Sequence, residues 1–114
     1  MRLLKAMPIS VVRRESSKTE RGVVVEGDTV NMKIKGNLQP ERNITLMREV
    51  FGANVESAIK IYTKEKLRTY STDGASDYID HDGVLYEVSQ VRRYETIIPH
   101  YKVIAIRKKD ELSS

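Results

Sequence analysis

The histidines, and the aspartates beside one of them, are the side chains of this sequence whose types suit metal binding or acid–base catalysis. His81 and His100 are its two imidazoles. Neither has a second histidine, a cysteine or a glutamate at the spacing of known metal-ligand motifs. Residues 80–83, Asp-His-Asp-Gly, resemble part of a calcium-binding loop, but the glutamate that completes such a loop is missing. The pattern therefore predicts a tight turn here and no metal site.

Nucleophilic and cofactor chemistry have no better support in the sequence. The chain has no cysteine, which excludes a thiol nucleophile, a zinc–thiolate site and a disulfide. It contains no glycine-rich phosphate-binding loop, no G-x-S-x-G and no H-E-x-x-H. Its closely spaced carboxylates lie among turn-forming residues, where solvated side chains are expected rather than an acid–base pair in a cleft. We therefore expect no catalytic residue, no cofactor and no enzymatic activity.

Charge is distributed in patches rather than in one tail. The chain carries 20 lysines and arginines against 16 aspartates and glutamates, a net charge of +4, without a block of five or six like charges. Separate basic and acidic patches suit head-to-tail contact between copies of one chain. The residues of these predicted inter-subunit patches are Arg13, Arg14, Arg92 and Arg93 on the basic side, and Asp73, Asp77, Asp80 and Asp82 on the acidic side.

Tyrosines interleaved with the basic residues raise a second possibility. Aromatic rings next to arginine and lysine can form a stacking platform for nucleic acid, as in OB folds. Strand alternation would bury many of these rings and spread the others. An OB-like or SH3-like nucleic-acid-binding module therefore stays an alternative. The tyrosines concerned are Tyr62, Tyr70, Tyr86, Tyr94 and Tyr101.

Length and composition limit the scaffold that can position these side chains. A chain of 114 residues with 39% hydrophobic and 32% charged residues fits one globular domain with a thin core. There is no run of about 18 apolar residues, and the N-terminal segment is too short and too charged for a signal peptide. We expect one domain over residues 1–114, with extended tails at 1–8 and 108–114, made and used in a cytosol without a membrane partner.

Most of the chain has the pattern of short strands. Strands are predicted at 9–14, 23–26, 29–35, 58–63, 78–81, 84–94 and 100–107 from β-branched content and alternation. Val30, Met32 and Ile34 alternate with polar residues, which indicates a strand with one buried face. Asp82-Gly83 between two of these segments is a strong hairpin signal. The predicted fold is all-β: a small antiparallel barrel or sandwich of about six strands with long loops.

A single helix is expected between the third and fourth of these strands. Ile44, Met47, Val50 and Phe51 recur at helical spacing, with Asn43 as N-cap and a glycine after the last turn. We expect this helix to lie across an open end of the barrel and to close it with Met47, Val50 and Phe51.

The order of these segments resembles a known family. "GNLQP" at 36–40, "AIKIYTKEKLRT" at 58–69, "DYIDHDGVLYEVSQV" at 77–91 and "IPHYKVIAIR" at 98–107 resemble the small head–tail joining proteins of tailed bacteriophages. These are also called head-closure, stopper or neck proteins of the virion collar. The resemblance extends over roughly residues 9–107.

The resemblance implies a structural virion protein of the neck or connector. Such a protein forms a ring of six or twelve copies below the portal and its adaptor, closes the DNA-filled head and provides the docking surface for the tail. The implied partners are further copies of the chain, the portal–adaptor protein, a tail-terminator or tail protein, and packaged DNA without sequence readout. The implied location is the head–tail interface of the virion, after assembly in the host cytoplasm. A tail-completion or terminator ring subunit is an alternative of the same architecture.

The family also implies a loop that closes the channel, here roughly residues 36–57. Because 44–51 is predicted as a helix, segments 68–76 and 15–22 compete for this role. The candidate gating residues are Gln39, Pro40, Arg42, Asn43, Arg48 and Asn54.

Overall fold

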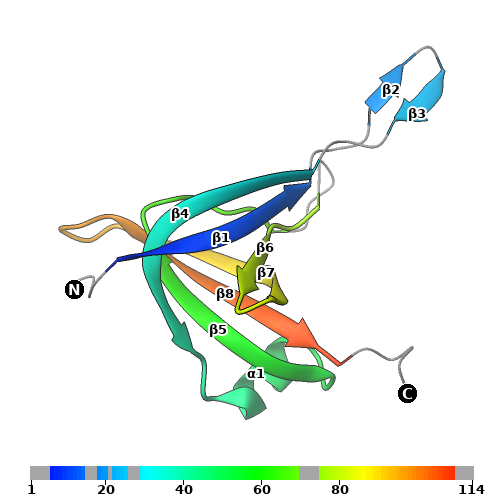
Figure 1. Ribbon diagram of the computed structural model, residues 1–114. Helices are drawn as coiled ribbons and strands as arrows, with labels where there is room; N and C mark the ends of the chain where they lie inside the picture. Colours follow the sequence, from blue (N-terminus) through cyan, green and yellow to red (C-terminus); the bar gives the residue numbers. More distant parts are fainter. Residues whose placement is uncertain (1–5, 15–17, 21, 26–28, 70–74, 110–114) are drawn as a thin grey trace.

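Six antiparallel strands close into a small barrel (Figure 1). The computed structural model describes residues 6–14, 18–20, 22–25, 29–69 and 75–109. The barrel order is β1-β4-β5-β8-β7-β6, and each neighbouring pair is antiparallel. The predicted small all-β fold with one short helix is confirmed. The strands are β1 (Met7–Arg14), β4 (Thr29–Pro40), β5 (Val55–Thr63), β6 (Tyr78–His81), β7 (Val84–Tyr94) and β8 (His100–Lys108).

Strands β2 (Lys18–Glu20) and β3 (Val23–Val25) form a separate two-stranded sheet. In Figure 1 this sheet stands away from the barrel, beyond the end of β1 and the start of β4. The sequence predicted a strand at 23–26 but did not show that its partner would be β2 rather than a barrel strand. Segment 15–22, a candidate gate, lies partly outside the described residues.

Alternation along the strands fills the barrel with aliphatic side chains. Ile9 lies opposite Ile34 and Val11 opposite Met32, so β1 and β4 turn the same face inward. The pattern predicted for residues 30–34 is confirmed at Ile34, which is 6% exposed, while Val30 at the strand's start is 40% exposed. The buried barrel core comprises Ile9, Val11, Ile34, Ile59, Ile61, Leu67, Ile79, Val88, Val103 and Ala105.

Helix α1 (Ile44–Phe51) forms where the sequence predicted it. Asn43 caps it, since its side-chain oxygen accepts a hydrogen bond from the Leu46 N–H at 3.1 Å. Gly52 follows the helix with φ +121°, a backbone conformation that favours glycine.

The position of α1 corrects the expectation that it closes an open end of the barrel. Met47 is buried with Ile104 and Ile106, in a cluster separate from the barrel core. Because Val103 and Ala105 point inward, these isoleucines lie on the outer face of β8. Val50 remains 56% exposed. The helix therefore packs outside the barrel, against β5 and β8.

The turn between β6 and β7 has the predicted two-residue form. Asp82 and Gly83 have φ of 53° and 79°, as a type I′ hairpin turn requires. His81 lies opposite Val84, which fixes the register of the hairpin.

Strand β7 changes its inward face at a β-bulge between Val88 and Gln90. Before the bulge Val88 points inward, whereas after it Val91 lies opposite the inward Val103. Gln90, Arg92 and Tyr94 therefore lie on the outer face. The bulge decides which side chains β7 presents at its far end.

The barrel strands extend further than the predicted tail boundaries allow. Strand β1 begins at Met7 and includes Pro8, and β8 ends at Lys108. These residues pair with neighbouring strands because Met7 lies opposite Gly36 and Lys108 opposite Val55. Residues 1–5 and 110–114 lie outside the described part of the chain.

Candidate functional site

Two of the residues assigned to inter-subunit patches instead pair with each other inside the chain. The Arg13 Nε and Nη2 groups donate to the two carboxylate oxygens of Asp77, each at 2.9 Å. The Asp77 side chain is fully buried and that of Arg13 is 17% exposed. Because both carboxylate oxygens are paired with Arg13 inside the chain, Asp77 is not part of a charged surface that a neighbouring subunit could contact.

Asp77 also connects three parts of the fold through its backbone and side chain. The Arg68 N–H donates to the Asp77 carboxylate at 2.8 Å, and the Asp77 N–H donates to the Arg68 carbonyl at 2.9 Å. The Val88 N–H donates to the Asp77 carbonyl at 2.9 Å. We call Arg13, Arg68, Asp77 and Val88 the Asp77 clasp. The clasp holds the end of β1, the segment before β6 and the middle of β7 together.

The other acidic patch residues differ in position. Asp80 and Asp82 are exposed at the β6–β7 turn, and Asp82 lies 3.6 Å from the His81 ring. Gly83 donates its N–H to the Asp80 side chain at 3.2 Å, which stabilises the turn. Asp73 lies outside the described residues. The turn therefore presents two exposed carboxylates at the start of β7.

The basic residues Arg92 and Arg93 lie near the other end of β7. Arg93 Nε donates to Glu95 Oε1 at 2.8 Å, and its guanidinium lies 6.0 Å from the Tyr101 ring centroid. Arg92 is opposite Lys102. The acidic turn and these arginines are separated by the 11-residue strand, roughly 30 Å. Arg14 is exposed at the end of β1.

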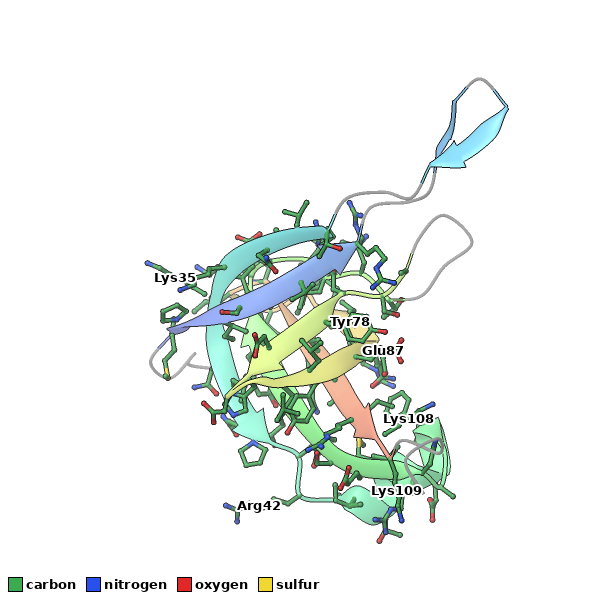
Figure 2. The ribbon with its side chains drawn as sticks, turned by 45° about the vertical axis from the view of Figure 1, so that its right-hand side comes forward. Lys35, Arg42, Tyr78, Glu87, Lys108 and Lys109 are labelled. Atoms are coloured by element: carbon green, nitrogen blue, oxygen red, sulfur yellow. The ribbon has the colours of Figure 1, made fainter. Side chains whose placement is uncertain are left out.

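The first three candidate gating residues line a surface hollow. Gln39 and Pro40 end β4, and Arg42 follows them and points away from the barrel (Figure 2). Together with Glu41 and Lys60 they line a hollow of about 380 Å³.

The other three gating candidates have structural roles. Asn43 caps α1, and the Arg48 Nε donates to the Val55 carbonyl at 3.0 Å. The Asn54 carbonyl accepts a hydrogen bond from the Lys109 N–H at 2.8 Å. These contacts attach α1 and its following turn to β5 and β8. The segment is a docked helix rather than an extended loop.

His100 is buried in the base of the β7–β8 hairpin, 5% exposed. Its ring stacks on Tyr94 with centroids 5.4 Å apart and faces Tyr62 at 6.1 Å. Its Nδ1 lies 2.9 Å from the Ile98 carbonyl oxygen. Within the described ranges no three His, Asp or Glu side chains are close enough to hold a metal ion.

Outward side chains on four neighbouring strands form a surface that the sequence analysis missed. Tyr62 lies opposite Lys102, which lies opposite Arg92. In the next outward row Lys60 lies opposite Ile104. The ion pairs of the described residues include none of these three cations. We call this surface the cationic rows. Its members are Asn37, Tyr62, Lys102 and Arg92, followed by Gln39, Lys60 and Gln90, while Ile104 between Lys60 and Gln90 is covered by α1.

The signal for the cationic rows was present in the sequence but depended on register. Residues 60 and 62, 90 and 92, and 102 alternate with neighbours that face the barrel interior. Only the strand order places them side by side, and only the bulge in β7 turns Arg92 outward.

The loop between β7 and β8 carries two exposed isoleucines. Ile97 is fully exposed, at 102%, and Ile98 is 41% exposed. This loop is orange at the left of Figure 1 and extends beyond the barrel. We call residues 95–98 the hairpin tip.

A second hollow lies between β4 and the end of β5. It has a volume of about 540 Å³. Figure 2 shows Lys35 at this margin, directed away from the barrel. We call it the β4–β5 hollow. It is lined by Ala6, Lys33, Ile34, Lys35, Gly36, Asn37, Tyr62, Thr63, Lys64 and Glu65.

Tyr78 and Glu87 lie side by side on β6 and β7 (Figure 2). Burial, and secondarily the negative charge of Glu87, raises the pKa of the Tyr78 hydroxyl above its usual 10.0. Hydrogen bonding with Glu87 favours the neutral phenol and raises the pKa further, whereas the positive charge of Arg14 lowers it. The pair joins the two strands next to the acidic turn.

Comparisons with protein-family models, with curated proteins and with solved structures found no match for this chain. None of the helices in the described residues has the length and apolar character needed to cross a bilayer.

Proposed function

We propose that this protein is a structural subunit of the phage neck, where a ring of copies closes the DNA-filled head and receives the tail. The observation that carries the proposal is the polarity of β7. Exposed Asp80 and Asp82 precede the strand, whereas Arg92, Arg93 and the exposed isoleucines lie at its far end. Different surfaces at opposite ends of one subunit suit head-to-tail contacts, which form a ring when the rotation closes.

The fold supports a passive, mechanical role. A closed six-stranded barrel provides a rigid body, while the β2–β3 sheet and the hairpin tip stand away from it (Figure 1). In a ring, each subunit would place one such projection near a narrow axis, so a small shift per subunit would change the aperture. Tail docking would then favour the open or the closed arrangement. The acceptor surface for the neck partners would be the outer face of the barrel.

The segment proposed to close the channel is not the one first expected, residues 36–57. Segment 36–57 is packed against the barrel through Met47, Arg48 and Asn54. The β2–β3 sheet stands away from the barrel (Figure 1). We therefore assign the gate to this sheet, at 18–20 and 23–25, in the proposed ring.

Light scattering tests the proposal. The mass of the purified protein would be measured at two concentrations, alone and mixed with a portal–adaptor assembly, with free DNA as a control. We expect a ring, or a monomer that assembles only on the adaptor. A monomer that ignores the adaptor would contradict the proposed function.

The cationic rows favour a second function, a nucleic-acid-binding module. Three cations, three amides and a tyrosine without a carboxylate suit the sugar–phosphate backbone. The test is the salt dependence of affinity for a short DNA duplex, which changes by about 0.9 in logarithmic slope for each phosphate contact. A Lys60→Gln, Arg92→Gln, Lys102→Gln variant would be compared with an Arg14→Gln, Lys108→Gln, Lys109→Gln variant of equal net charge.

The two functions differ in their expected results. A DNA-binding module predicts tight binding by the monomer, with a slope lowered by about 2.7 only when the three row cations are removed. A neck subunit predicts weak binding by the monomer and the same loss in both variants.

A further inference from the structure

The hairpin tip exposes apolar side chains that do not contribute to the folding of the single chain. Ile97 touches little of its own chain, being fully exposed, and Ile98 is 41% exposed. Neither is required for the barrel core or the cluster under α1. Two adjacent aliphatic side chains at the end of a projecting hairpin are suited to insertion into an apolar site on another molecule.

The tip is held in one conformation before any partner binds. The Thr96 hydroxyl donates to the Ile98 carbonyl at 2.8 Å, and His100 Nδ1 contacts the same oxygen at 2.9 Å. His100 in turn stacks on Tyr94 at the base of the hairpin. Because these contacts order the loop in advance, binding through the isoleucines loses less conformational entropy.

The β4–β5 hollow is complementary to the hairpin tip in polarity and charge. Ile34, Gly36 and Thr63 are buried and form its floor, while Lys33, Lys35 and Lys64 are exposed at its rim. Glu65 is the one carboxylate among its lining residues, which leaves the rim with a net positive charge.

The charge of the tip matches this rim. The Glu95 side chain is 72% exposed, and Arg93 Nε contacts its Oε1 at 2.8 Å. This exposed carboxylate can accept a hydrogen bond from a lysine of the rim. Ile97 and Ile98 would contact the apolar floor, and the Glu95 carboxylate would lie close to the lysine ammonium groups of the rim.

We propose that the hairpin tip of one copy inserts into the β4–β5 hollow of a second copy. Ile97 and Ile98 contact the floor at Ile34 and Gly36, and Glu95 pairs with a rim lysine. The full exposure of Ile97 shows that the tip does not occupy the hollow of its own chain. Where each hollow receives the tip of a different copy, the contact is heterologous and propagates from copy to copy. The inference rests on the proposed ring and gives it a contact in addition to that between the acidic turn and the arginines of β7.

Mixed disulfide formation tests the contact directly, because the chain has no native cysteine. An Ile97→Cys variant would be mixed with a size-tagged Ala6→Cys variant under mild oxidation. Thr45→Cys, exposed on α1, replaces Ala6→Cys in the matched control. We expect a tagged heterodimer with Ala6→Cys at least tenfold in excess over that with Thr45→Cys. Equal yields of the two heterodimers would overturn the proposal.

Assembly of surface variants distinguishes this contact from the proposed function. Ile97→Ser with Ile98→Ser should abolish the ring, whereas Val50→Ser with Leu85→Ser, which removes similarly exposed apolar residues, should preserve it. A ring that survives the loss of both tip isoleucines refutes the tip contact and leaves the neck function standing. A wild-type chain that never assembles, alone or on an adaptor, refutes the neck function, while the disulfide experiment still decides the contact.

Charge reversal tests which charged residues pair across the proposed contact. Glu95→Lys should weaken assembly, and one of Lys33→Glu, Lys35→Glu and Lys64→Glu in the same chain should restore it. Restoration supports a pair between the tip and the rim. If none of the three second substitutions restores assembly, the proposed position of Glu95 is refuted.

Discussion

The Asp77 clasp and the hairpin tip both gather charged and polar groups at a strand end, but they satisfy those groups in different ways. In the clasp the Asp77 carboxylate receives three hydrogen bonds from Arg13 and Arg68 and is fully buried. At the tip Ile97, Ile98 and most of Glu95 face solvent. The first arrangement stabilises the fold, whereas the second leaves binding energy available to another molecule.

The same contrast occurs along α1. Met47 is buried against β8, whereas its helix neighbours Leu46 and Val50 are exposed. A substitution at Met47 should therefore affect folding, and substitutions at Leu46 or Val50 should leave the fold intact.

The largest effect is expected for Met47→Asp. A carboxylate buried without a partner should lower the free energy of unfolding by more than about 4 kcal/mol and prevent folding of this small barrel. Circular dichroism and denaturant unfolding would measure it. Leu46→Asp, on the exposed side, should remain folded. A soluble, folded Met47→Asp protein that forms leaky rings would indicate that α1 is a gate after all.

The next largest effect is expected at the clasp. Asp77→Asn removes the charge that pairs with Arg13 and should lower the free energy of unfolding by about 3 kcal/mol, in the range for breaking a buried ion pair. Urea unfolding at neutral pH would measure it. Asp80→Asn, at the exposed turn, should change stability by less than about 0.5 kcal/mol. Equal losses of stability at the two positions would show that the clasp stabilises the fold no more than an exposed residue does.

A small effect is expected when the ion pair of the tip is broken. Glu95→Gln removes the partner of Arg93, but both side chains are more than half exposed and are screened by solvent. The free energy of unfolding should therefore change by less than about 1 kcal/mol. The same variant should weaken assembly if Glu95 contacts a second copy. A loss of stability comparable to that of Asp77→Asn would place the tip among the structural contacts.

The smallest effect concerns alkaline pH. The raised pKa of Tyr78 means that the folded chain keeps the phenolic proton at a pH where the unfolded chain releases it. This contribution to stability is present in full below pH 10 and is lost as the pH rises through the raised value. Unfolding measured from pH 8 to above pH 10 should show a steeper decline in the wild type than in Tyr78→Phe. Parallel curves would contradict the raised pKa of Tyr78.

Local patterns were sufficient to predict most elements of the fold. Alternation at residues 30–34 and the Asp82-Gly83 turn each determine geometry within a few residues, and both are confirmed. The helix and its Asn43 cap were predicted for the same reason. Its docking was predicted wrongly because helical spacing shows which side is apolar but not which surface covers it. The covering residues Ile104 and Ile106 are over fifty positions away.

The surface chemistry was harder to predict because it depends on distant pairing. Asp77 follows a run of turn-forming residues and looked like a solvated side chain, yet its partner Arg13 is 64 residues away. The cationic rows required both strand order and register. The tip residues Ile97 and Ile98 lie between two predicted strands, and only their exposure in the fold distinguishes them from core residues.

The bulge in β7 makes the surface of this protein sensitive to strand pairing as well as to residue type. Ser89 is the residue without a partner on β8, so deleting it would remove the bulge and leave Gln90, Arg92 and Tyr94 on the outer face. If Ser89 instead paired regularly with β8, Arg92 and Tyr94 would turn toward the barrel interior, and Val91 and Arg93 would turn toward solvent. A relative of the same length that lost the bulge could keep every side chain of the hairpin and still present a different face to its neighbours. A change of pairing at this one position is thus an evolutionary route to new partners that counting substitutions would not detect.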